Sequence, residues 1–157
     1  MNDLVQAKLK KIFDGRFSIS ESTRANYARG EDTYDPILSK AVVFPETNEE
    51  VSKILKLCNE HKIPVVPFGT GTSLEGNVVG NDKGITISLE KMNKVLSVNV
   101  EDFDCRVQAC VTKEQLNDYL REDGVFFPID PGANAAIGGM ASTSASGTMA
   151  VKYGTMK

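Results

Sequence analysis

A glycine-rich loop directly after a short β-branched strand constrains this chain more than any other part of its sequence. The strand is expected at residues 63–66 and the loop at residues 67–76. Glycine takes positive φ readily and lets the backbone approach a ligand, so successive N–H groups can converge on an anion. The loop contains three glycines and three hydroxyl side chains, namely Gly69, Gly71, Gly76, Thr70, Thr72 and Ser73. These features predict a loop that holds a diphosphate.

The spacing of these glycines is G-x-G-x-x-x-x-G. It matches neither the G-x-G-x-x-G of dinucleotide-binding folds nor the G-x-x-x-x-G-K-[ST] of the P-loop. A wide turn between two strands stays open as the alternative for this loop on its own.

A second segment of small residues favours the ligand-binding interpretation. Residues 126–134 read FFPIDPGAN and lead into residues 138–147, which read GGMASTSASG. Backbone with so many small side chains has room to lie against a flat ligand, although a flexible linker is the alternative for residues 142–146. Asp130, between Ile129 and Pro131, is expected to accept turn N–H groups or to contact a cofactor rather than to act as a general base.

Together these segments resemble a flavoprotein family. The two loops, residues 84–89 (GITISL) and residues 151–155 (VKYGT) are similar to the vanillyl-alcohol-oxidase / para-cresol-methylhydroxylase type, above all to its branch of D-lactate dehydrogenases and flavin-binding glycolate oxidase subunits. The resemblance covers roughly residues 39–157. The UDP-N-acetylmuramate reductases of the same superfamily are a weaker match at residues 130–134.

The resemblance implies FAD as cofactor. With no histidine in either loop, and with Cys105 and Cys110 on an expected hairpin, the flavin is expected to be non-covalent. The implied cofactor-binding residues are Pro67, Phe68, Gly69, Thr70, Gly71, Thr72, Ser73, Leu74 and Gly76 in the first loop, and Pro131, Gly132, Ala133, Gly138, Gly139, Ser142, Thr143, Ser144, Ser146, Gly147, Tyr153 and Gly154 beyond it.

The implied fold is α+β: a small parallel βαβ lobe at about residues 1–92, then the start of a mainly antiparallel lobe at about residues 93–157. Capping boxes at Thr47/Glu50 and Thr112/Gln115 predict two helices, and Gly124 ends the second. Apolar residues at helical spacing predict another over residues 4–13. Strands are expected at residues 41–44, 65–66, 85–89 and 126–128, and a hairpin at residues 96–111 with its turn at 101–104.

Composition excludes several classes of function. The 157 residues carry a net charge of −3 and lack a cluster of Lys and Arg with interleaved aromatics, which argues against a nucleic-acid partner. The apolar runs are shorter than the ~20 residues of a membrane span, and a cytoplasmic location follows. Three cysteines without C-x-x-C spacing indicate free structural thiols, and no metal site is expected. His61, the single histidine, is expected to end a helix rather than to catalyse.

The family further implies an enzyme that oxidises a D-2-hydroxy acid, glycolate or D-lactate, by hydride transfer to the flavin. The electrons would then pass to an acceptor or to other oxidase subunits. Such partner subunits could hold the protein at the surface of the inner membrane. Family members are longer, so this chain is interpreted as an amino-terminal part without catalytic residues. We expect it to be inactive alone, to bind FAD weakly at best, and to self-associate through an exposed strand edge. A non-catalytic flavin-binding or nucleotide-binding module, or a regulatory subunit, is the alternative.

Overall fold

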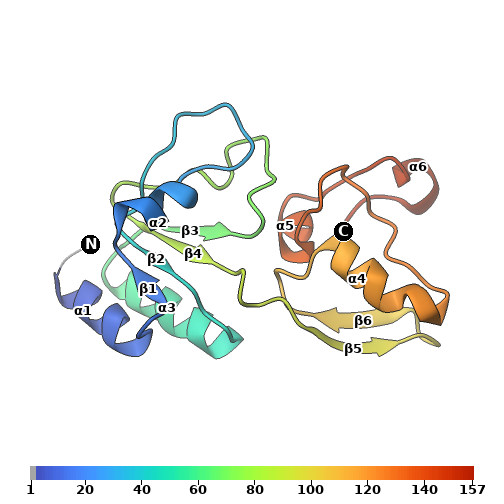
Figure 1. Cartoon of the computed structure of the whole chain (residues 1–157), viewed down its shortest axis with the longest axis horizontal. Helices are drawn as coiled ribbons and strands as arrows, with labels where there is room; N and C mark the ends of the chain where they lie inside the picture. Colours follow the sequence, from blue (N-terminus) through green and yellow to red (C-terminus); the bar gives the residue numbers. More distant parts are fainter. Residues whose placement is uncertain (1–2) are drawn as a thin grey trace. The chain divides into compact units, whose positions relative to one another are not determined.

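The computed structural model describes residues 3–157, and the chain divides after Lys91 into two compact units (Figure 1). The first unit holds a four-stranded sheet and three helices. Its elements are α1 (Asp3–Ile12), β1 (Phe17–Ser18), α2 (Glu21–Asn26), β2 (Val42–Val43), α3 (Asn48–Glu60), β3 (Val65–Phe68) and β4 (Ile85–Ser88).

The sheet has the order β1-β2-β4-β3. Strand β4 pairs in parallel with both β2 and β3, with Thr86 opposite Val42 on one side and opposite Val66 on the other. Helix α3 therefore forms the crossover of a parallel β-α-β unit, as predicted, because parallel strands need a long connection. The two-residue β1 adds an antiparallel edge that the sequence did not reveal.

Helices α1 and α3 cover one face of this sheet, and α2 lies on the other (Figure 1). The core on the first face joins Val5, Leu9 and Phe13 to Ile54 and Cys58, and all five are at most 1% exposed. The predicted apolar stripes were too wide: Leu4, Ile12 and Leu55 are 45–57% exposed. Spacing alone marks a face of a helix, but the sheet covers only its centre.

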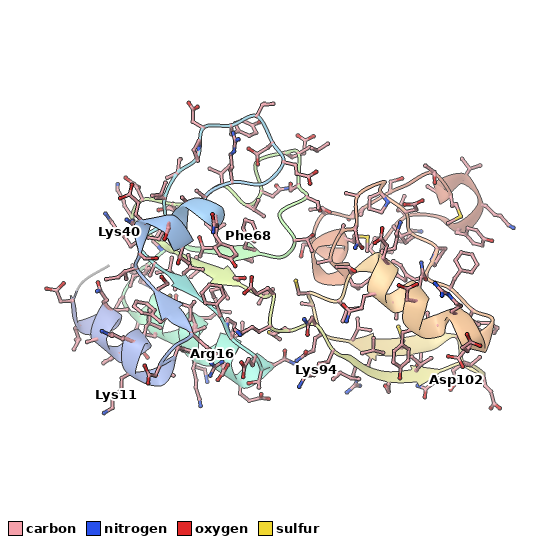
Figure 2. All side chains as sticks on the ribbon, viewed as in Figure 1. Lys11, Arg16, Lys40, Phe68, Lys94 and Asp102 are labelled. Atoms are coloured by element: carbon pink, nitrogen blue, oxygen red, sulfur yellow. The ribbon has the colours of Figure 1, made fainter. Side chains whose placement is uncertain are left out.

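The two predicted N-caps are present, but the side chains of Glu50 and Gln115 make their closest hydrogen bonds to groups other than the capping threonines. Thr47 accepts a hydrogen bond from the Glu50 N–H at 3.2 Å, and Thr112 accepts one from Gln115 at 3.2 Å. The Glu50 carboxylate instead accepts the Glu46 N–H and binds Arg16, labelled in Figure 2, through two contacts of 2.6 Å. The Gln115 side chain donates to the Asn93 carbonyl.

The second unit contains a hairpin, one longer helix and two short ones. Its elements are β5 (Val95–Asn99), β6 (Asp104–Val107), α4 (Lys113–Leu120), the 3-10 turn η1 (Arg121–Asp123), α5 (Ile137–Ser142) and α6 (Ala150–Tyr153). Antiparallel β5 and β6 pack on α4 around Val111, Leu116 and Leu120. Gly124 follows η1 with φ 70°, which is the left-handed end that the sequence predicts there.

The strand predicted at residues 126–128 is wrong. These residues have no regular secondary structure. The backbone of Phe127 bonds the Asn117 side chain of α4, which accepts from its N–H at 2.7 Å and donates to its carbonyl at 3.2 Å. One side-chain amide thus replaces both hydrogen bonds that a neighbouring strand would supply.

The α+β class and the order of a parallel unit followed by an antiparallel one are confirmed. No helix within residues 3–157 is both long enough and apolar enough to cross a membrane.

Candidate functional site

The first predicted loop begins later than expected. Pro67 and Phe68 belong to β3, and the Phe68 side chain, labelled in Figure 2, is 7% exposed and lies edge-on to the ring of Tyr27 at 5.0 Å. Irregular backbone runs from Gly69 to the start of β4 and includes the other predicted residues of this loop. The Phe68 side chain therefore packs inside the first unit, and its backbone carbonyl accepts the Leu89 N–H at 2.9 Å at the end of the sheet.

Glycine is required at Gly71, which has φ 75°. A Cβ built on Gly71 would lie 2.8 Å from the Phe68 ring. Gly76 also has positive φ, 70°, and packs against the ring of Tyr34. Both positions confirm that the loop uses left-handed backbone, which other residues adopt only at a cost.

The backbone N–H groups of residues 69–74 have no hydrogen-bond acceptor anywhere in residues 3–157. The hydroxyls of Thr70 and Thr72 lie beside them, 3.4 Å from each other, and Ser73 receives hydrogen bonds from Glu75 and Asn77. Consecutive free N–H groups around a left-handed glycine form the concave arrangement that binds anions. The donor set of this loop fits a diphosphate, and it contains no Lys or Arg.

A second segment, residues 28–34, packs on this loop, and no motif in the sequence pointed to it. Glu31 donates its N–H to the Gly71 carbonyl at 2.9 Å. Asp32 is 7% exposed, and its carboxylate accepts the N–H groups of Gly30 at 3.0 Å and Tyr34 at 3.1 Å. The detectable signal was the Gly30-Glu31-Asp32 sequence, because Gly and Asp together are typical of a tight turn.

In the second unit, Asp130 is the centre of the second predicted loop. Its carboxylate accepts hydrogen bonds from Lys113 at 2.9 Å, from the Gly132 N–H at 3.2 Å and from Thr148 at 3.3 Å. The Lys113 ammonium and then the Gly132 N–H hold the pKa of Asp130 below its usual value. Asp130 is therefore a charged turn residue, as expected, and Lys113 and Thr148 are partners that the sequence did not suggest.

Two of the predicted ligand-facing glycines pack against the protein itself. A Cβ on Gly138 would lie 2.8 Å from Ala109, and a Cβ on Gly147 would lie 1.8 Å from the Asp130 carbonyl oxygen. Gly132, Gly139 and Gly154 differ, because a Cβ on any of them would meet nothing within 4 Å. Close approach of backbone explains the first pair without a ligand, whereas the other three lie open.

Residues 142–145 end helix α5 and do not form a linker. Ser142 and Thr143 donate their hydroxyls to the carbonyls of Gly138 and Gly139 at 2.8 and 3.0 Å. Ser144 has φ 49°, its N–H bonds to Ala141, and Ala145 bonds back to Met140, which is a Schellman ending. Ser144 thus occupies a left-handed position where glycine is usual. Ser146 is exposed.

The remaining predicted residues lie in irregular backbone or at the end of α6. Pro131 is exposed, and Ala133 accepts a hydrogen bond from the Ala135 N–H at 2.8 Å. Tyr153 packs edge-on against Phe126 with ring centroids 5.5 Å apart, and the Lys152 ammonium lies 4.9 Å from its ring centroid. The contacts described for each loop are made with residues of its own unit.

Cys58 and Cys110 are buried and Cys105 is exposed on β6, none of them in a disulfide, and His61 is the C-cap of α3. Burial raises the pKa of the Cys58 thiol, and burial followed by the charge of Asp104 raises that of Cys105. Neither loop contains a cysteine or histidine. Within residues 3–157, no three His, Cys, Asp or Glu side chains are grouped so as to hold a metal ion.

Comparison with known proteins decides the family. The model of the FAD binding domain family matches residues 39–157. The chain belongs to this family. The resemblance drawn from the two loops is thereby confirmed.

Curated proteins similar to this chain include D-lactate dehydrogenases and a glycolate oxidase subunit. The chain is 46% identical over 144 residues to the probable mitochondrial D-lactate dehydrogenase of Danio rerio, covering 92% of the chain and 29% of the relative. It is 41% identical over 153 residues to the mitochondrial D-lactate dehydrogenase [cytochrome] of Arabidopsis thaliana (96% and 27%). It is 29% identical over 143 residues to glycolate oxidase subunit GlcD of Bacillus subtilis (90% and 30%). The chain spans less than a third of the length of each of these relatives.

Solved structures show the same fold. An alkyldihydroxyacetonephosphate synthase matches with a TM-score of 0.89 at 22% identity, over 99% of this chain and 31% of that one. A p-cresol methylhydroxylase matches with a TM-score of 0.64 at 24% identity, over 82% and 26%. At these identities the likeness concerns fold alone, and it confirms the para-cresol-methylhydroxylase type.

Proposed function

We propose that this chain binds FAD without a covalent bond, as part of a longer enzyme that oxidises a D-2-hydroxy acid to the 2-oxo acid. The observation that carries the proposal is the row of N–H groups at residues 69–74 without a protein acceptor, around the left-handed Gly71. Membership of the FAD binding domain family and the D-lactate dehydrogenases among the relatives support it.

In this proposal the chain contributes binding and orientation. FAD, when bound, supplies the chemistry by accepting the hydride from the α-carbon of the hydroxy acid. The first loop would hold the diphosphate with neutral backbone dipoles, so the affinity should depend only weakly on salt. In the second loop, the predicted residues at 131–133, 138–147 and 153–154 would line the rest of the cofactor, with Gly132, Gly139 and Gly154 offering open backbone.

The absence of cysteine and histidine from both loops supports a dissociable flavin. None of the residues described here is assigned to proton abstraction or to binding the substrate carboxylate. An electron acceptor, other oxidase subunits, self-association through a strand edge and a cytoplasmic location remain parts of the proposal. Glycolate oxidase subunit GlcD of Bacillus subtilis is by its name one subunit of a larger oxidase.

Acid precipitation of the longer protein tests the cofactor assignment. We expect the flavin in the supernatant, whereas yellow colour that stays with the pellet would contradict non-covalent binding. Reduction of a dye acceptor with D-lactate or glycolate tests the activity. A flavin-loaded protein that reduces the dye with neither acid would favour the alternative, a flavin-binding module or regulatory subunit without turnover.

A further inference from the structure

We propose that the turn at residues 28–34 orients the first loop for anion binding, with Gly30 and Asp32 as its positioning residues; this rests on the function proposed above. The turn and the loop are distant in sequence. They are joined by the Glu31 N–H, which bonds the Gly71 carbonyl at 2.9 Å, and the Gly80 N–H, four residues after the loop, bonds the Ala28 carbonyl of the turn at 2.8 Å. In Figure 1 the two segments form neighbouring loops beyond β3 and α2.

Two carbonyl groups of the loop face Gly30. A Cβ built on Gly30 would lie 2.5 Å from the Gly71 oxygen and 2.9 Å from the Ser73 oxygen. Real Cβ atoms essentially never come within 3.0 Å of another heavy atom, so any other residue at position 30 would push the loop away. Glycine at this position lets the turn hold both carbonyls on its own side.

The direction of two N–H groups follows from these carbonyls. Peptide bonds in the described residues include no cis bond, and in a planar trans peptide the C=O and the next N–H point in opposite directions. Since the Gly71 and Ser73 carbonyls face the turn, the N–H groups of Thr72 and Leu74 face away from it. At these two peptides the N–H dipoles lie on the side away from the turn and the carbonyl dipoles on the side of the turn, and an anion is attracted only by the first.

Asp32 keeps the turn in shape. Its buried carboxylate accepts two backbone N–H groups, from Gly30 and from Tyr34, and so closes the turn around Glu31. A Cβ built on Gly76 would lie 2.8 Å from the Tyr34 ring. This close packing holds the far end of the loop against the same turn. Loss of the Asp32 carboxylate would release Glu31 and with it the Gly71 carbonyl.

The test follows amide signals of the ¹⁵N-labelled 157-residue chain by NMR while inorganic pyrophosphate or FAD is added. Weak binding is sufficient, because the shifts are compared at saturation. We expect both ligands to shift the Thr72 and Leu74 amides. In Gly30→Ala the affinity should fall about tenfold, as for the loss of one or two hydrogen bonds, and the Glu31 amide should exchange faster.

Gly84→Ala is the matched control, since its Cβ would meet the Pro64 carbonyl oxygen at 2.4 Å, before the start of β3 and thus at the opposite end of that strand from the loop. It should destabilise the unit comparably and leave the affinity unchanged. Asp32→Ala adds no atoms against the loop, and decides the question if Gly30→Ala does not fold. Wild-type affinity in a folded Gly30→Ala chain, or equal losses in Gly30→Ala and Gly84→Ala, would overturn the inference.

The same titration separates this inference from the proposed function. If FAD shifts other amides of residues 69–76 but not those of Thr72 and Leu74, the orientation is wrong and FAD binding stands. If neither ligand shifts any amide of this loop, the orientation inference is wrong, and the flavin content of the longer protein decides the proposed function separately.

Discussion

Replacing Glu50 with Gln should lower the free energy of unfolding by about 2 kcal/mol at pH 7. Glu50 accepts two hydrogen bonds of 2.6 Å from Arg16, which ties the segment between α1 and β1 to the first turn of α3. It also accepts the Glu46 N–H at 2.7 Å. The Arg16 guanidinium above all lowers the pKa of Glu50 from 4.5 to about 2. Glutamine keeps the shape but loses the charge.

The magnitude follows from that pKa. At ~1.4 kcal/mol per pH unit, a fall in pKa from 4.5 to about 2 corresponds to about 3.5 kcal/mol as an upper limit. The two side chains are 23% and 21% exposed, so water and salt reduce this figure, while a fully exposed pair would be worth only about 0–1 kcal/mol. About 2 kcal/mol lies between these limits.

Urea denaturation followed by circular dichroism measures the effect. The folded pKa is lowered, so the contribution of Glu50 is fully present above pH 4.5 and is lost as the pH falls toward 2. The difference between wild type and Glu50→Gln should therefore shrink over that range. Glu49→Gln, in the same helical turn but exposed and without an arginine partner, should change stability far less than Glu50→Gln. Equal effects of the two substitutions at pH 7 would refute the reasoning.

Three further predictions concern the loop, a helix end and the chain as a whole. Gly71→Val places a branched side chain at φ 75° and 2.8 Å from the Phe68 ring. The longer enzyme with this substitution should keep its circular dichroism spectrum but lose its flavin. Full flavin occupancy would show that the loop is only a turn. Lys62 lies at the left-handed end of α3 with φ 54°, so Lys62→Gly should raise the free energy of unfolding, measured by urea denaturation, by about 0.5–1 kcal/mol. Lys62→Ala should give no such gain. A gain in both variants would exclude backbone strain as the cause. The 157-residue chain alone should be folded yet reduce no dye with D-lactate or glycolate, and turnover would show that the catalytic residues lie within it.

The helices and strands with strong local signals were predictable from sequence. Thr47 and Thr112 marked helix starts because a side-chain oxygen next to free N–H groups is a local device. Gly124 marked an end for a similar local reason. The alternating residues of β5 and β6 gave the hairpin with small errors at its ends.

Features that depend on residues distant in sequence were not predictable. The strand expected at residues 126–128 was displaced by Asn117, whose amide bonds Phe127 from another element. Gly138 and Gly147 suggested a ligand, but their neighbours in space are Ala109 and Asp130. A glycine reports that something comes close, and only the fold shows what it is.

The first loop was found from its glycines, but the turn that holds it was not. Gly30 and Asp32 lie about forty residues before Gly71, and no periodic or motif signal joins them. Their relation consists of a carbonyl in the space of a missing Cβ and of one hydrogen bond from Glu31. Contacts of this kind exist only after tertiary packing.

The position of β4 in the sheet also governs the order in which the first unit can assemble. β4 is the last of the four strands in the chain, yet it lies between β2 and β3, which do not pair with each other. During synthesis, only the short β1–β2 contact can form before β4 has left the ribosome. Parallel pairing then requires closure of chain segments of some twenty to forty residues, which slows folding. Until that moment β2 and β3 have unpaired edges, and this is the interval in which a nascent chain most needs a chaperone.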